Sequence, residues 1–106
     1  MNFLVHIETS LPPTMPSDDR QALLDRELSR GIALREAGVI TSIWRIPGRL
    51  ANVGVWACQD ADALHAAISS LPAWPWMNVT VTPLGSHPVM HPPAADSTVD
   101  LGSTLD

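Results

Sequence analysis

The sequence predicts an α+β domain of the ferredoxin-like type, with the element order βαββαβ and a four-stranded antiparallel sheet. Four segments with the patterns of strands are interrupted by two segments with helical periodicity. The chain has 106 residues, of which 45% are hydrophobic, and this suits one compact domain. Right-handed crossovers would place both helices on one face of the sheet.

Each element has its own signal in the sequence. The first strand carries apolar residues at every second position, as a half-buried strand requires. The first helix follows the rigid connection LPPTMP, with Ser17 as its predicted N-cap and Gly38 as its stop. A Pro-Gly turn separates the next two strands, and Asp60 is predicted to cap the second helix. The predicted strands are 2–10, 39–47, 50–57 and 76–83, and the predicted helices are 17–37 and 61–71.

Alternation along the strands assigns side chains to the two faces of the sheet. The apolar set is expected to face the helices: Phe3, Val5, Ile7, Ala51, Val53, Val55, Ala57, Met77, Val79 and Val81. The opposite set is polar and aromatic: His6, Glu8, Asn52, Trp56, Trp76, Asn78 and Thr80. Arg45 is placed with this second set, unless a bulge near Pro47 reverses it. A face with two tryptophans favours closure by a second sheet around a polar pocket.

Composition excludes several classes of function. The net charge is −5 and the six Lys and Arg residues form no cluster, so the electrostatic footprint of a nucleic-acid-binding protein is missing. Only 16% of residues are charged, which favours burial of some surface in a homo-oligomer. The single Cys58 allows no intrachain disulfide and fits a reducing compartment. With no signal peptide and no apolar run of membrane-spanning length, we expect a soluble, cytoplasmic protein that does not bind membranes.

Residues 1–88 are predicted to form the folded domain, and residues 89–106 a tail rich in Pro, Ser, Thr and Asp. Such a composition is typical of disorder, and an arm that lies across a neighbouring subunit is the alternative.

Two charged residues stand out as candidates for chemistry. Glu27 falls within the apolar arc of the first helix, so it faces the sheet or a subunit boundary. Burial would raise its pKa and make it a better proton acceptor near neutral pH. The structural alternative is an ion pair with Arg20 or Arg30. Arg45 has the same two interpretations: it pairs with Glu8 or Glu27, or it binds a substrate carboxylate or stabilises an enolate.

The remaining polar candidates carry weaker signals. Asn52 either caps a sheet edge or orients a substrate carbonyl. His6 is most simply a hydrogen-bonded strand histidine, and His65 a residue at the edge of the second helix. The four histidines lack ligand spacing such as H-x-x-x-H, so no metal site is predicted. This inventory suits cofactor-free proton transfer on a small organic acid, and it also suits ligand binding without catalysis.

Short pieces follow one another in a specific order: LPPTMP after the first strand, RE at 26–27, AGVITSIWRIPGRLAN at 37–52, ALHAAISSLPAWPWM at 63–77, VTP at 81–83 and HP at 87–88. From about residue 2 to residue 88 this order resembles the muconolactone delta-isomerase family of catechol breakdown. The resemblance implies sheet-to-sheet pairing into a dimeric α/β barrel, assembly up to a decamer, and a site covered by another chain's C-terminal segment. It also implies conversion of muconolactone to its enol-lactone with no metal or organic cofactor.

The resemblance further implies roles for residues at matching positions. Glu27 would move the proton, and Arg45 would bind the carboxylate or the developing oxyanion. The substrate-binding residues would be Trp44, Asn52, His65 and Trp76, to which the polar sheet face adds His6 and Trp56.

Some positions depart from the family pattern. Leu28 stands where the family usually has lysine, Ser42 where it has histidine, Arg49 and Leu50 where it has histidine and tyrosine, and Trp76 where it has tyrosine. These departures point to a bulkier or less polar lactone, or to another cofactor-free enzyme on the same barrel: a lactone dehalogenase, dehydratase, cyclase or small monooxygenase. A non-enzymatic ligand-binding module is the remaining alternative. It predicts that the region around Glu27, Arg45 and Asn52 is packed shut, whereas an enzyme needs a cavity of a few hundred Å³ there.

Overall fold

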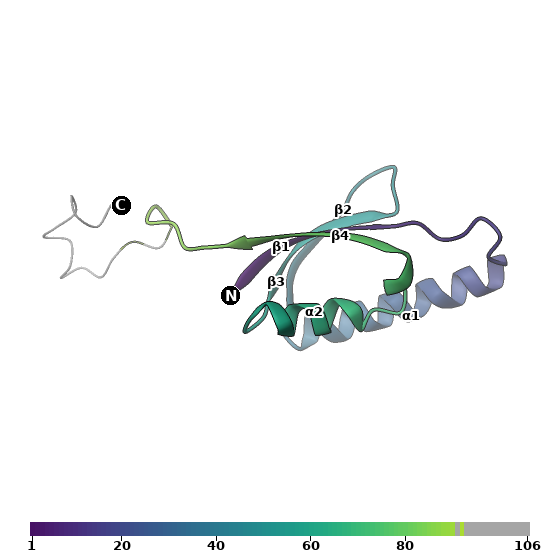
Figure 1. The fold of residues 1–106 in the computed structure, drawn as a ribbon, viewed down its shortest axis with the longest axis horizontal. Coiled ribbons are helices and arrows are strands. Elements are labelled where there is room, and N and C mark those ends of the chain that lie inside the picture. Colours follow the sequence, from purple (N-terminus) through teal and green to yellow (C-terminus); the bar gives the residue numbers. More distant parts are fainter. Residues whose placement is uncertain (91, 93–106) are drawn as a thin grey trace, which may run out of the picture.

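The computed structural model describes residues 1–90 and 92, and it has the predicted order of elements (Figure 1). The strands are β1 (Asn2–Thr9), β2 (Ile40–Arg45), β3 (Ala51–Ala57) and β4 (Met77–Leu84). The helices are α1 (Ser17–Glu36), α2 (Ala61–Ser69) and one short 3₁₀ turn, η1 (Trp74–Trp76). The predicted tail beyond residue 92, with its two alternatives, lies outside the described residues.

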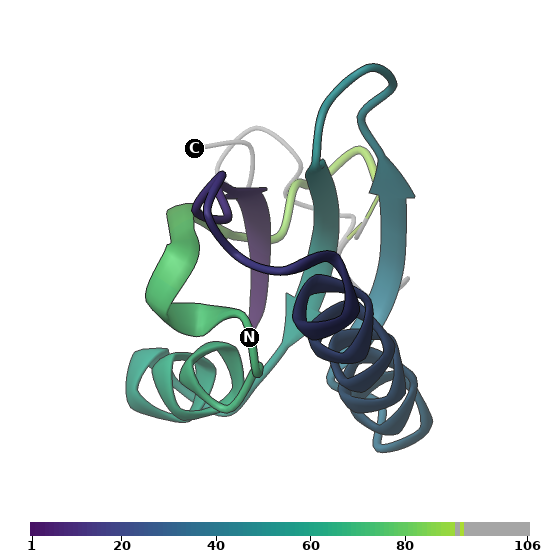
Figure 2. The same cartoon turned by 90° about the vertical axis from the view of Figure 1, so that its right-hand side faces the viewer.

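The strands form one antiparallel sheet in the order β2-β3-β1-β4. Figure 1 shows α1 and α2 on the same side of this sheet, and Figure 2 shows them next to each other beneath it, with α1 on the β2 side. The ferredoxin-like prediction is therefore confirmed. Within residues 1–90, no helix is both long enough and apolar enough to span a membrane.

The helix ends follow the predicted signals with one exception. Asp60 caps α2, since its Oδ1 accepts a hydrogen bond from the Ala63 N–H at 2.8 Å. Gly38 follows α1 with a φ of +79°, a left-handed conformation that favours glycine. The predicted N-cap was wrong by one residue, because Pro16 holds that position and Ser17 begins the helix. Proline offers no capping side chain, so the acidic first turn of α1 is what complements the helix dipole.

The hydrophobic core lies between the sheet and the two helices. Its buried members are Phe3, Val5, Ile7, Leu34, Ile40, Trp56, Leu64, Ile68 and Leu71. The predicted inward residues of β1 and β4 are paired across the two strands, Ile7 opposite Val79 and Val5 opposite Val81. Directly opposite residues share a face of the sheet, so the predicted faces of these two strands are confirmed.

The strand register reverses the predicted faces of the other two strands. Ile7 lies opposite Asn52, and Asn52 lies opposite Arg45, so one row of side chains crosses β1, β3 and β2. Ile7 is 2% exposed within the core, so the whole row faces the helix layer. Trp56 shares this face, because it lies opposite Phe3 and is itself 1% exposed. The prediction that Arg45, Asn52 and Trp56 point away from the helices was wrong.

The error has a physical cause. Apolar side chains occupy both faces of β3, so their alternation does not determine which set points inward. The set predicted to face the helices, Ala51, Val53, Val55 and Ala57, lies on the outer face instead. Gly54 lies in the middle of the inward row, where an added Cβ would collide with the Ser42 backbone oxygen of β2. The register shift between Ile40 and Ser42 accompanies this close approach.

Candidate active site

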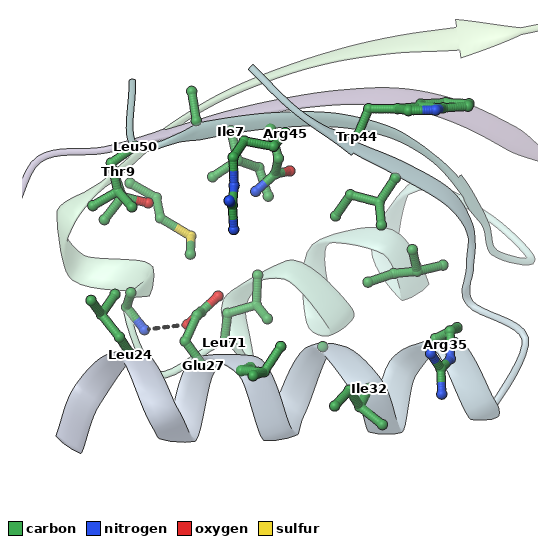
Figure 3. A pocket seen from close by; sticks show the side chains of 18 of the residues that line it. Ile7, Thr9, Leu24, Glu27, Ile32, Arg35, Trp44, Arg45, Leu50 and Leu71 are labelled. Carbon is green, nitrogen blue, oxygen red and sulfur yellow. Dashed lines mark hydrogen bonds between the residues drawn. The ribbon is translucent and has the colours of Figure 1, made fainter. Parts of the chain in front are cut away.

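A cavity of about 460 Å³ is formed between α1, the β2–β3 hairpin and the corner that connects α2 to β4. Glu27, Arg45 and Asn52 all line it. A cavity at this place is what the enzyme interpretation required, and the closed packing expected of the non-enzymatic alternative is absent from the described part of the chain. Figure 3 shows the helix wall below and the strand wall above, with polar groups projecting from each.

Glu27 is the acidic group of this cavity. It is half-buried on α1, and its Oε1 accepts a hydrogen bond from the main-chain N–H of Ala73 at 2.9 Å. Burial raises the pKa of the Glu27 carboxyl above its ordinary value, although the Ala73 hydrogen bond opposes part of this effect. Neither alternative ion pair, with Arg20 or with Arg30, is formed within residues 1–90, and the Arg30 Nε donates to Ser70 Oγ at 3.0 Å instead. Figure 3 shows the second Glu27 oxygen pointing into the cavity towards Arg45.

Arg45 and Asn52 form the facing wall. They lie opposite each other on β2 and β3, with both side chains on the helix side of the sheet. Glu8, one of the predicted partners of Arg45, is instead bound by Arg49 through both of its carboxylate oxygens. Within residues 1–90, Arg45 therefore takes part in no ion pair, and Asn52 Oδ1 is buried without a hydrogen-bond partner. Both side chains remain available to a ligand in the cavity.

The remainder of the cavity wall is mainly apolar. Leu24 and Ile32 come from α1, Ile43 and Leu50 from the hairpin, and Leu71 from the corner. Apolar walls lower the local dielectric, which strengthens the field of a fixed cation and makes a carboxylate a stronger base. The arrangement is a carboxylate that faces a guanidinium across an apolar space. It can remove a proton from a carbon acid and stabilise the negative charge that develops.

The other predicted site residues are distributed over the molecule. Trp56 lines the inner end of the cavity as part of the core. Trp44 lies at the rim, with its side chain 61% exposed and its ring on the outer side of the sheet (Figure 3). His6 is on the outer face opposite Val53, away from the cavity. No cluster of three or more His, Cys, Asp or Glu side chains suitable for a metal occurs in the described part of the chain.

The last two predicted residues belong to the α2 side of the molecule. His65 packs edge-to-face on Trp74, with ring centroids 5.6 Å apart, and lines a separate cavity beside α2. Trp76 is half-buried in η1 and not among the residues that line the larger cavity.

Sequence reasoning missed the contribution of the α2–β4 corner. Leu71, Ala73 and Met77 line the cavity, and the Ala73 main chain holds Glu27. The corner sequence LPAWPW carries a signal, since two prolines in six residues indicate a rigid turn. A main-chain donor is the same in every residue except proline, so the sequence does not reveal which N–H meets the carboxylate.

These features define a small α+β protein with a carboxylate and a guanidinium in one apolar cavity. The family model for muconolactone delta-isomerase matches residues 1–90. A muconolactone delta-isomerase of Cupriavidus pinatubonensis is 33% identical over 88 residues, which cover 83% of this chain and 96% of the relative. One from Acinetobacter baylyi is 31% identical, with 83% and 92% covered. The chain therefore belongs to the muconolactone delta-isomerase family and is an isomerase.

A solved structure supports the same assignment. The crystal structure of a muconolactone isomerase superimposes with a TM-score of 0.78 at 32% sequence identity. The match covers 83% of this chain and 92% of that one. Sequence and fold therefore agree on the family over most of the chain.

The raised pKa of Glu27 makes a prediction for stability. The folded protein holds the Glu27 proton more tightly than the unfolded chain does. The contribution of Glu27 to stability therefore falls as the pH rises from 4.5, its ordinary pKa, through the higher pKa of the folded state. Glutamine keeps an acceptor for Ala73 and has no proton to lose. We expect the stability of Glu27→Gln relative to wild type to be greater at pH 8 than at pH 4.

Urea unfolding at the two pH values measures this difference. Glu36→Gln, which changes an exposed glutamate on the same helix, is the control and should show no comparable gain at pH 8. An equal difference between Glu27→Gln and wild type at both pH values would show that burial does not raise this pKa.

Proposed function

We propose that this chain catalyses the shift of a ring proton in muconolactone, or in a substituted muconolactone, to give the enol-lactone during catechol-type aromatic degradation. The observation that carries the proposal is the placement of Glu27 opposite Arg45 and Asn52 across one apolar cavity. Membership of the family supplies the reaction class, and the cavity supplies the groups that such a reaction needs.

In the proposed mechanism, Glu27 removes the proton from the ring carbon that carries the carboxymethyl group. The C–H electrons delocalise through the ring double bond to the lactone carbonyl oxygen, which gives a dienolate. The same carboxyl group then returns the proton at the carbon alpha to the carbonyl, so one C–H bond is broken and one is formed. A base whose pKa is raised towards the working pH suits both transfers.

Arg45 and Asn52 are proposed to hold the substrate and its developing charge. A guanidinium binds a carboxylate through two parallel hydrogen bonds, and it stabilises an oxyanion in the same way. Either role requires an Arg45 without an intramolecular acid, which is what the Glu8–Arg49 pair provides. Asn52 is proposed to donate its amide hydrogens to the lactone. The cavity volume of about 460 Å³ leaves room for a ring substituent.

We further propose that two chains pair through the outer face of the sheet, and that the protein is cytoplasmic. The outer face carries apolar side chains without cover in one chain: Leu4 is 37% exposed, Trp44 61% and Leu84 39%. Sheets pack face to face through such surfaces. The free Cys58 thiol suits a reducing compartment.

The catalytic proposal predicts a large loss of turnover on removal of the base. Glu27→Gln should lower kcat on muconolactone by about 10²–10⁴-fold, the usual contribution of a general base. Arg45→Met should raise KM and lower kcat, because it removes the only proposed cation at the substrate. Formation of the enol-lactone is followed optically, with Glu36→Gln as the control. Wild-type rates in Glu27→Gln would show that Glu27 is not the base.

The proposed pairing predicts that a charge on the outer face separates the subunits. Leu4→Lys would bury an unpaired cation in the sheet-to-sheet contact, which costs free energy and should separate the subunits. The molar mass of the Leu4→Lys protein, measured by light scattering, should therefore be lower than that of wild type. Leu28→Lys, which places the same charge on α1 in the helix layer, should keep the wild-type mass. If Leu4→Lys stays folded and keeps the wild-type mass, the outer face is not the contact.

A further inference from the structure

The corner between α2 and β4 is unusually well fixed for a connection. Trp74 N–H donates to the Leu71 oxygen at 3.0 Å, and Trp76 N–H donates to the Ala73 oxygen at 2.9 Å. Ser10 N–H, which follows β1, donates to the Trp76 oxygen at 2.9 Å. Pro72 and Pro75 restrict the backbone further. The peptide unit of Ala73 therefore has little freedom to reorient.

This corner is also where α1 is attached to the rest of the chain through polar contacts. Glu27 accepts from Ala73, and Arg30, three residues further along α1, donates to Ser70. Residues three apart lie on one side of a helix, so both bonds hold the same side of α1. The side of α1 that carries the proposed base is thus tied to the corner by two hydrogen bonds.

We propose that the main-chain N–H of Ala73 is the positioning group of the active site: it holds Oε1 of Glu27, so that Oε2 is the oxygen that removes and returns the proton. This inference rests on the proposed function. Ala73 is 1% exposed, so water does not compete for its N–H, and the Glu27 oxygen is its only acceptor among the described contacts. With one oxygen engaged, the carboxylate is held in one orientation towards the cavity (Figure 3).

The same hydrogen bond adjusts the basicity of Glu27. Burial favours the protonated form, whereas a hydrogen bond donated to the carboxylate favours the ionised form. The other charged groups that line the cavity are Arg35 on α1, Arg45 on β2 and Arg49 in the hairpin, and the corner and β4 contribute none. Arginines keep their charge across the working pH range. If the pKa of Glu27 changes when the Ala73 N–H is removed, the change comes from the loss of that hydrogen bond and not from titration of another charged group in the cavity.

The direct test replaces the Ala73 amide with an ester, which removes the N–H and keeps the methyl side chain. Cys58 supplies a native ligation junction, so residues 58–106 can be made synthetically with lactic acid at position 73. An ester at Ser86, an exposed residue beyond β4, is the matched control. Circular dichroism and light scattering establish that both proteins fold and assemble as wild type does.

We expect the ester at position 73 to move the acid limb of kcat/KM for muconolactone upwards by about one pH unit, since a hydrogen bond to a charged group is worth roughly tenfold in an equilibrium. On the plateau, kcat should fall roughly tenfold with KM within about twofold, because the carboxylate loses its orientation while Arg45 still binds the substrate. The Ser86 ester should match wild type. A folded Ala73 ester with the wild-type limb and kcat would overturn the proposal.

A second measurement needs neither the ester nor turnover. In wild-type protein labelled with ¹³C and ¹⁵N, the Ala73 amide proton should shift with pH at the same midpoint as the Glu27 carboxyl carbon, and Glu27→Gln should abolish this shift. An Ala73 amide that is insensitive to pH, or that titrates equally in Glu27→Gln, would overturn the inference. If no lactone is turned over, the proposed function fails, and this measurement still decides whether Ala73 holds Glu27.

Discussion

The site depends on one row of paired residues across three strands. Ile7, Asn52 and Arg45 lie opposite one another on β1, β3 and β2, and Ile7 is fixed in the core. Because paired residues share a face, burial of Ile7 places the amide and the guanidinium on the side of the sheet that faces the helices. A slip of one residue in the β1–β3 pairing would send both polar groups to the outer face, and a slip in the β2–β3 pairing would send Arg45 there alone. Either slip would take Arg45 away from Glu27.

The charges around the cavity are distributed so that Glu27 and Arg45 both remain free to contact a ligand. Four charged side chains line the cavity, one glutamate and three arginines. Within the described residues, Glu27 and Arg45 do not form an ion pair with each other. Arg49 is bound by Glu8, and Glu27 is held by a neutral donor, the Ala73 N–H. A neutral partner fixes the carboxylate while leaving it basic, whereas a bound arginine would depress its pKa strongly.

Much of the fold follows from local signals in the sequence. The Asp60 cap, the Gly38 stop and the alternation in β1 and β4 gave the correct elements, and the helical arc of α1 correctly placed Glu27 towards the sheet. The face of β3 did not follow, because Val53 and Val55 make its outer row as apolar as its inner one. Which face of β3 points inward is decided by the register between strands, and register is a long-range property.

The Glu27–Ala73 contact was equally beyond local reasoning. It joins residues 46 positions apart, and the donor is a main-chain group without a residue signature. The family pattern pointed to Glu27 and Arg45, which both line the cavity, but strand alternation placed Arg45 and Asn52 on the wrong side of the sheet. The difference matters for mechanism, since a cavity between the sheet and α1 is built by one chain, whereas a pocket on the outer face needs two sheets.

The most direct test is a crystal structure of Glu27→Gln with bound muconolactone. The placement of Glu27 opposite Arg45 predicts the lactone between α1 and the β2–β3 hairpin, with its carboxylate or its lactone carbonyl on Arg45. The ring carbon that carries the carboxymethyl group should then lie beside the substituted side chain at position 27. A lactone bound on the outer face of the sheet, near His6 and Trp44, would contradict it.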